Sequence, residues 1–209
     1  MNKNKKIIIV IIIIAIIALV TTLGYFVMLK IERNKVQSTI EEMFSNLKSN
    51  ENNNQKQEVL KEIESNYNEE NSTGYAIDYI ELFGKLNYSI VKDEVNFKEA
   101  TVILDITNKD MKAILGNYIL KSMQLAIANA FTPTYSEEQI NEELERYLKE
   151  KIESDDIENI TTQIMLKMEK QNGKWIIKEE NKEKLINAIL PGFIDAVNQI
   201  NDSFNKNEK

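Results

Sequence analysis

Two side chains have the chemistry and the sequence position to act as a general acid or base. Asp105 is the one carboxylate within the core of a strand-like stretch, and Tyr88 lies on the stretch before it. A carboxyl or phenol held in a pocket can transfer protons in catalysis. Side chains alternate along a strand, however, so Asp105 lies on the face opposite Val102 and Leu104. We expect Asp105 to face solvent, and the sequence predicts no catalytic residue.

Acidic pairs are the only other candidates for chemistry, because adjacent carboxylates could hold calcium. None lies in the glycine-containing loop of an EF-hand. We interpret the pairs as the faces and ends of helices, and we predict no metal and no cofactor. They are Glu41-Glu42, Glu69-Glu70, Glu137-Glu138, Asp155-Asp156 and Glu179-Glu180.

The composition excludes several mechanisms. The 209 residues contain neither His nor Cys. Ser-His and Cys-His nucleophiles are therefore impossible, and the usual ligands of zinc and copper are missing. Frequent Ile, Lys, Asn and Glu residues suggest an AT-rich genome, as in low-GC Gram-positive bacteria.

The first part of the chain predicts a membrane anchor. Residues 1–6 form a basic tail with three lysines, and residues 7–29 contain no charged residue. A helix of that length matches a hydrocarbon core of about 30 Å. A cleaved secretory signal is the alternative, but its apolar core usually spans only ~7–15 residues and ends at small residues. The segment after Leu23 offers no such cleavage site, so we predict a retained signal-anchor.

The orientation of this anchor depends on its flanks. The three lysines of the tail precede it, and Lys30, Arg33 and Lys35 follow it, so the positive-inside count is nearly balanced. A short basic tail rarely crosses a membrane, whereas large domains do so largely regardless of charge. We predict a single-pass protein of the cell membrane, with residues 1–6 in the cytoplasm and residues 30–209 outside.

The part after the anchor is acidic. It holds 23 of the 26 Lys and Arg residues and all 33 Asp and Glu residues, a net charge of −10. Such a surface repels phosphate backbones and anionic headgroups. We therefore expect no nucleic-acid binding, and we expect contact with the membrane through the anchor alone.

Apolar periodicity predicts an α+β domain. Helical spacing covers 31–48, a short segment near Val59–Ile63 and about 73–83, with a polar break at 49–57. Alternation then predicts four antiparallel strands, which contain Tyr88, Val102, Ile164 and Trp175. Asn172-Gly173 suits a type I′ turn between the last two strands, because both residues accept positive φ. Trp175 is interpreted as core.

A helical insertion at about 109–157 interrupts the strands. Asp110 can cap its first helix, and Ser136 with Gln139 forms a capping-box pattern at its second. A last helix begins near Asn181, with a kink or restart at Pro191-Gly192. The inward stripe predicted for the first inserted helix is Ile114, Leu115, Tyr118, Ile119, Met123, Ala126, Ile127 and Ala130.

This order of elements resembles the cystatin-like, or nuclear-transport-factor-like, cone: leading helices, a curved four-stranded antiparallel sheet and a C-terminal helix. Short sequences add to the likeness to envelope-anchored domains of low-GC Gram-positive bacteria, many of them lipoproteins. The resemblance implies a fold and not an activity, because that family has no agreed one. The sequences are Leu86-Asn87-Tyr88, Ala100-Thr101-Val102, Ile106-Thr107-Asn108-Lys109-Asp110 and Asn172-Gly173-Lys174-Trp175-Ile176-Ile177.

The second face of the predicted sheet has polar ends but an apolar centre, formed by Val91, Ile103, Met165 and Ile176. An antiparallel sheet that faces water normally alternates cleanly. Cover by the helical insertion and ordinary surface apolarity are two explanations. The third is an interaction surface for a second copy or for another envelope protein.

Three functional hypotheses follow. The first is a membrane-anchored extracytoplasmic binding or assembly module of the cell envelope, an architecture similar to the single-span assembly components of type IV secretion and conjugation channels. The second is a small-molecule-binding domain that uses the interior of the cone. An enzyme is the least favoured, because no acid–base pair is evident.

Overall fold

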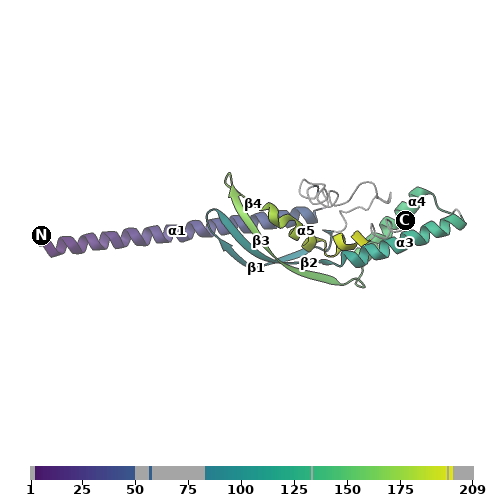
Figure 1. Cartoon of the computed structure of the whole chain (residues 1–209). Coiled ribbons are helices and arrows are strands. Elements are labelled where there is room, and N and C mark those ends of the chain that lie inside the picture. Colours follow the sequence, from purple (N-terminus) through teal and green to yellow (C-terminus); the bar gives the residue numbers. More distant parts are fainter. Residues whose placement is uncertain (1–2, 50–56, 58–82, 133, 197, 200–209) are drawn as a thin grey trace.

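The computed structural model describes residues 3–49, 57, 83–132, 134–196 and 198–199, with side chains from residue 11 onward. It is an α+β structure with one long apolar helix, a four-stranded antiparallel sheet and further helices (Figure 1). The short helix predicted near 59–63, and nearly all of the one at 73–83, lie outside the described residues.

One continuous helix joins the apolar N-terminal segment to the domain. α1 (Lys3–Lys48) is 46 residues long, which corresponds to about 69 Å at ~1.5 Å per residue. Its second part carries a buried stripe at the spacing predicted for 31–48, because apolar residues three or four apart share one face of a helix. The buried residues are Val36, Ile40, Met43, Phe44 and Leu47.

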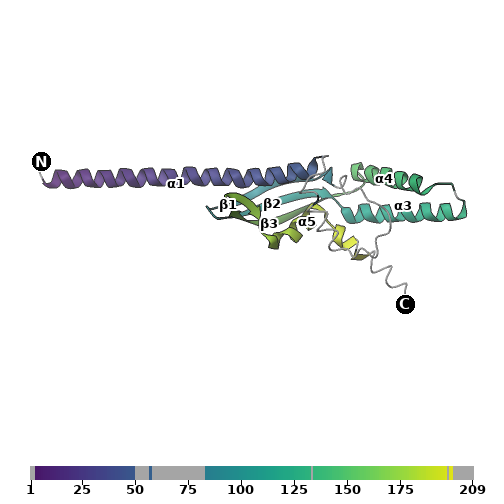
Figure 2. The ribbon, with the colours of Figure 1, turned by 90° about the horizontal axis from the view of Figure 1, so that it is seen from above.

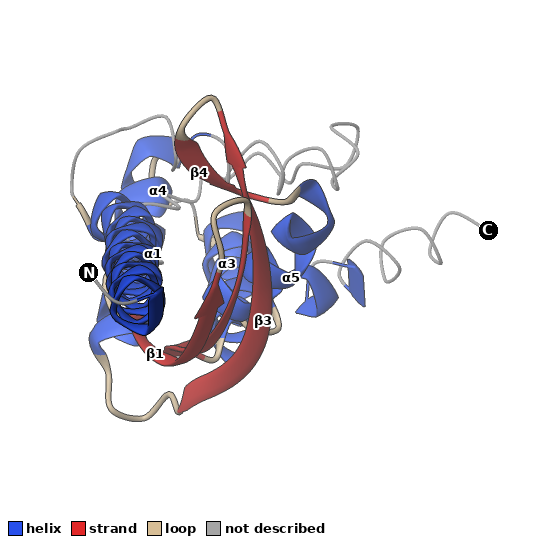
Figure 3. Ribbon diagram, turned by 90° about the vertical axis from the view of Figure 1, so that its left-hand side faces the viewer, coloured by secondary structure: helices blue, strands red, loops and turns tan. Residues whose placement is uncertain are grey.

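The four strands form one open sheet in the order β1-β2-β3-β4. They are β1 (Asn87–Val95), β2 (Glu99–Lys109), β3 (Asn159–Gln171) and β4 (Lys174–Ile177). β1 and β2 change register between Ile90 and Lys92, so Val91 forms a bulge. Figure 3 shows the strands curling around α1. The curved sheet therefore holds the helix on its buried face.

The turn between β3 and β4 has the predicted geometry. Asn172 has φ 51° and Gly173 has φ 82°. A type I′ turn needs positive φ at both central residues, and Asn-Gly is the pair that adopts it most readily. Four antiparallel strands and this hairpin are thus confirmed.

Two helices are inserted between β2 and β3. α3 (Met111–Phe131) is capped by Asp110, which accepts hydrogen bonds from the backbone N–H groups of Lys112 and Ala113. α4 (Glu137–Glu153) begins with the complete Ser136–Gln139 capping box. Figures 1 and 2 show the pair extending from the end of the domain opposite the N-terminus. Both predicted caps are therefore confirmed.

The inward stripe predicted for α3 is only partly correct. Ile114, Leu115 and Tyr118 are buried, but Met123 and Ile127 are each 56% exposed, and Ala126 and Ala130 are also exposed. The prediction failed because α3 projects beyond the sheet, so that α4 is the main described element beside its outer half.

The C-terminal segment breaks where the sequence predicts. α5 (Lys182–Ile189) follows the short helix η3 (Glu179–Asn181) and ends before Pro191-Gly192. Gly192 has φ 75°, and a Cβ there would lie 2.9 Å from the Cβ of Lys112. The carbonyl of Pro191 accepts a hydrogen bond from the N–H of Met111. This turn therefore closes on the start of α3.

Buried polar groups join the sheet to the helices at one corner. The amide of Asn108 donates to the carbonyl of Ile189 at 2.8 Å. The ammonium of Lys109, whose residue is only 5% exposed, donates to the carbonyls of Ser154 and Ile157, each at 2.8 Å. Buried polar groups are costly unless paired, so these bonds fix how β2, α4, β3 and α5 meet.

Candidate functional site

The first part of α1 is exposed along its whole described length. Every side chain from Ile11 to Met28 is exposed, and this is the one described helix long and apolar enough to cross a membrane, with a mean hydropathy of 2.7. The hydroxyls of Thr21 and Thr22 donate to the carbonyls of Ile17 and Ala18, at 3.0 and 2.7 Å. The two threonine hydroxyls are thus satisfied within the helix, as a hydrocarbon environment would require.

The domain reaches back along this apolar segment. Phe97, in the turn between β1 and β2, contacts Tyr25 edge-to-face, with ring centroids 5.4 Å apart. Tyr25 also contacts Phe26. Tyrosine and tryptophan are enriched at the boundary between a membrane and water, so Tyr25 suits that position. The sheet therefore sits close to the point where a membrane around α1 would end.

A buried carboxylate lies just after the apolar segment. Glu32 is 7% exposed and accepts hydrogen bonds from Lys170 at 2.7 Å, Lys35 at 3.0 Å and the indole N–H of Trp175 at 3.0 Å. Lys170 and Trp175 flank the β3–β4 turn. Glu32 therefore fastens α1 to the far edge of the sheet.

Hydrogen bonding to the charged form keeps Glu32 ionised. The bond from Lys170, with help from Lys35 and Trp175, lowers its pKa from 4.5 to about 2, against the opposing effect of burial. Sequence reasoning missed this residue, because a Glu between Ile31 and Arg33 has the pattern of a solvated helix face. The prediction that Trp175 belongs to the core is confirmed, because the residue is only 5% exposed. The sequence did not reveal that its indole N–H donates to Glu32.

Three of the four predicted surface residues gather on the outer face of the sheet. Ile103 and Met165 are register partners on β2 and β3, and the Val91 bulge on β1 directly precedes Lys92, the register partner of Ile103. Val91 is 52% exposed and Met165 51%, while Ile103 is half-buried. We call these three residues the outer patch.

Ile176 lies apart from the outer patch. It pairs with Glu169 on β3, four residues from Met165, which is about 13 Å at ~3.3 Å per residue. Lys167 lies between them on the same face and forms an ion pair with Glu180. Charged side chains therefore divide the predicted surface, and Ile176 belongs to the edge of the cavity described below.

Asp105 and Tyr88 lie on opposite faces of the sheet. Asp105 is on the outer face and accepts a hydrogen bond from Gln163 at 2.8 Å. Tyr88 pairs in register with Ile106 and stacks on Phe44 at 4.1 Å between ring centroids. Burial raises the pKa of its phenol. The two groups cannot act on one substrate.

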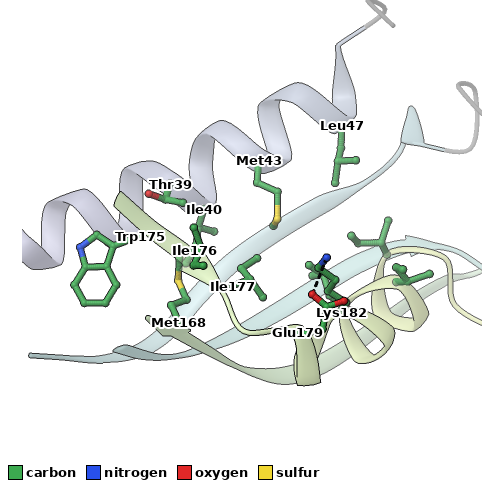
Figure 4. Close-up of a pocket in the computed structure, with 13 residues that line it drawn as sticks. Thr39, Ile40, Met43, Leu47, Met168, Trp175, Ile176, Ile177, Glu179 and Lys182 are labelled. Atoms are coloured by element: carbon green, nitrogen blue, oxygen red, sulfur yellow. Dashed lines mark ion pairs between the residues drawn. The ribbon is translucent and has the colours of Figure 1, made fainter. Parts of the chain in front are cut away.

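A cavity of about 410 Å³ lies between α1, β4 and α5 (Figure 4). Its walls are mostly aliphatic, and Trp175 lies at one end. Glu179 and Lys182 form an ion pair of 2.9 Å at its rim. Ligand pockets of this size are typically apolar with few polar groups. Its other wall residues are Thr39, Ile40, Met43, Leu47, Met168, Ile176, Ile177, Leu185, Ile186 and Ile189.

The acidic pairs lie at helix ends or on exposed faces. Glu137 and Glu138 occupy the first turn of α4, where negative charge favours the helix. Within the described part of the chain, no three acidic side chains come together as a group that could hold a metal ion. Glu69-Glu70 lies outside the described residues.

Comparison with protein-family models finds no family that matches the chain, and neither curated proteins nor solved structures give a match.

Proposed function

We propose that this chain is a single-pass membrane protein whose α+β domain serves as a binding or assembly module of the cell envelope. The observation that carries the proposal is the continuity of α1. One helix is apolar and exposed from Ile11 to Met28, and it then supplies the buried stripe of the domain from Val36 to Leu47. The proposed anchor and part of the domain core therefore belong to the same helix.

The cone resemblance and the orientation are part of this proposal. A curved four-stranded sheet around a helix is compatible with the cystatin-like, nuclear-transport-factor-like fold. We place the N-terminal lysines in the cytoplasm and the domain outside the cell membrane, because short basic tails rarely cross. The outer patch is the surface proposed for another envelope protein.

A binding role is favoured over catalysis by the geometry of the candidate groups. Asp105 and Tyr88 lie on opposite faces of the sheet. The carboxylate of Glu32 already accepts hydrogen bonds from three donors within the domain. A general acid or base needs a pKa near the working pH, whereas the pKa of Glu32 is about 2.

Carbonate extraction tests the anchor. Full-length protein should stay in the membrane pellet, and mass spectrometry should find its N-terminus intact. A soluble form that starts near Tyr25 would show that the segment is a cleaved signal and would overturn the proposal.

Protease digestion tests the orientation. Protease added to wall-free cells should degrade the domain and spare a cytoplasmic control protein. A domain that is protected until the cells are lysed would lie in the cytoplasm.

A second candidate function, small-molecule binding, is favoured by the cavity alone. Trp175 is the one tryptophan of the chain and lies in the cavity wall. An apolar ligand should therefore change its fluorescence, and Met43→Phe or Leu185→Phe, which narrow the cavity without adding a second tryptophan, should abolish that response to a fatty-acid probe. Saturable quenching in the original chain, absent in both variants, would support this candidate.

A further inference from the structure

An apolar stripe runs along the outer side of α3, away from the sheet and from α4. Leu120 is 60% exposed, Met123 and Ile127 are each 56% exposed, and Phe131 is 86% exposed. Soluble proteins rarely leave several large apolar side chains in one exposed row without a partner. We therefore expect another molecule to cover this stripe.

The spacing of the stripe matches a coiled-coil seam. Leu120, Met123 and Ile127 are three and four residues apart, and Gly116 and Ala130 continue the same alternation on either side. This is the spacing of heptad positions a and d. Phe131 follows Ala130 directly and lies outside this row. Leu120 and Ile127 take the a positions. We call the set the α3 seam, and it consists of Gly116, Leu120, Met123, Ile127 and Ala130, all of them exposed.

The seam carries no charge that would select a charged partner. Lys121 is the one charged residue between Ala113 and Glu137. Its ammonium is turned to α4, where it pairs with Glu143 at 3.1 Å and lies over the ring of Tyr147. An uncharged a/d row fits another row of the same kind.

The membrane that holds α1 cannot cover the seam. Figures 1 and 2 show α3 at the end of the molecule opposite the apolar part of α1, pointing away from it. α1 and α3 also run in the same general direction. Two copies anchored side by side in one membrane would therefore present their seams in parallel, related by a two-fold axis along the membrane normal.

We propose that the α3 seam is a parallel homodimer interface, an inference that rests on the proposed anchoring of both copies in one membrane. The seam is only about 21 Å long at ~1.5 Å per residue. A single row of side chains of that length buries little area, whereas stable interfaces in dilute solution usually bury about 1,200–2,000 Å². Co-localisation in the bilayer supplies the missing affinity, because it raises the effective concentration of the second copy.

Single cysteines test the proposal cleanly, because the chain has none of its own. Full-length Leu120→Cys and Met123→Cys proteins in proteoliposomes should form disulfide-linked dimers under copper-phenanthroline. Ala128→Cys is the matched control, since Ala128 is exposed on the same helix but lies roughly 100° round it from Ile127. The seam variants should react about ten-fold faster than the control, because a disulfide needs Cβ atoms ~3.5–4.5 Å apart.

A charge in the seam gives the second test. Ile127→Glu added to Leu120→Cys should lower dimer yield at least about five-fold, since two like charges would face each other. Ala128→Glu should leave the yield unchanged. Ile127 and Ala128 are both exposed, so neither substitution should unfold the domain. Unchanged Trp175 fluorescence will show that the fold is retained.

Other outcomes overturn the proposal. Equal rates at Leu120, Met123 and Ala128 would show that the seam does not pair. Linkage of Leu120→Cys only to Ile127→Cys would show an antiparallel arrangement. In native membranes, adducts with a different protein and not with a second copy would assign the seam to that protein. Carbonate extraction of the same vesicles separates these failures from a failure of the anchor.

Discussion

The indole N–H of Trp175 donates a hydrogen bond to the carboxylate of Glu32 across 3.0 Å. These residues are 143 positions apart, and their contact ties the start of the domain helix to the last strand. Lys170 completes the junction, with its ammonium 2.7 Å from the same carboxylate oxygen and over the ring of Trp175.

Neutralising Glu32 should weaken the fold. Because its pKa in the folded protein is lowered to about 2, its contribution to stability is full above about pH 4.5 and is lost as the pH falls toward 2. Glu32→Gln should therefore reduce the free energy of unfolding at pH 7 by roughly 1–3 kcal/mol. Urea titration of the detergent-solubilised protein, followed by Trp175 fluorescence, measures this difference.

The urea titration of Glu32→Gln has a matched control, and the stability difference that it measures should depend on pH. Glu42→Gln changes an exposed glutamate of the same helix and should leave the stability within about 0.5 kcal/mol. The gap between the original chain and Glu32→Gln should shrink as the pH is lowered. A gap that stays constant from pH 7 to pH 3 would contradict the assigned role.

Removing the buried ammonium of Lys109 should be more costly than most substitutions. Lys109→Met keeps the aliphatic stem but leaves the carbonyls of Ser154 and Ile157 without their donor. We expect a loss of about 2–4 kcal/mol in the free energy of unfolding. Lys174→Met, at an exposed lysine, is the control. Equal denaturation midpoints for the two variants would show that water replaces the ammonium.

Charges on the outer patch should block binding without unfolding the domain. A photo-crosslinking residue at Val91 should give a discrete adduct in native membranes, and Ile103→Lys plus Met165→Lys should abolish it, because a buried unpaired charge costs several kcal/mol. The melting temperature should stay within a few degrees. Ile176→Lys is the control, since Ile176 lies away from the patch. An adduct that survives the double substitution would rule the patch out.

Gly192 should tolerate no side chain. Its φ of 75° is strained for other residues, and an added Cβ would meet Lys112 at 2.9 Å. Gly192→Ala should destabilise the protein by roughly 1–3 kcal/mol. A Cβ added at Gly116 would have nothing within 4 Å in a single copy, so Gly116→Ala should stabilise α3 of the detergent-solubilised monomer by up to about 1 kcal/mol. Chemical denaturation of both variants gives the comparison, and a neutral Gly192→Ala would contradict the packing of this turn.

Local signals in the sequence were sufficient for much of the fold. The Asn172-Gly173 turn and the caps at Asp110 and Ser136 depend on neighbouring residues, so they could be read directly. The buried stripe of α1 follows from its spacing. Period-2 alternation likewise predicted which face of β2 is buried.

Long-range contacts could not be predicted in this way. Glu32 and Lys109 look like ordinary surface residues until the chain brings their partners to them from over 40 positions away. The exposure of Met123 and Ile127 depends on how far α3 extends past the sheet, which its own apolar residues do not reveal. The bulge at Val91 and the separation of Ile176 likewise arise from strand register.

Because α1 is continuous from Lys3 to Lys48, the apolar segment and the domain are joined rigidly. No flexible linker separates the apolar segment from the helix that the sheet encloses, so a change in the tilt of one is a change in the tilt of the other. Helices tilt when the bilayer around them thins. In the proposed single-pass arrangement, a change in the tilt of the apolar segment would therefore also move the α3–α4 tip, which lies at the opposite end of the molecule (Figure 1).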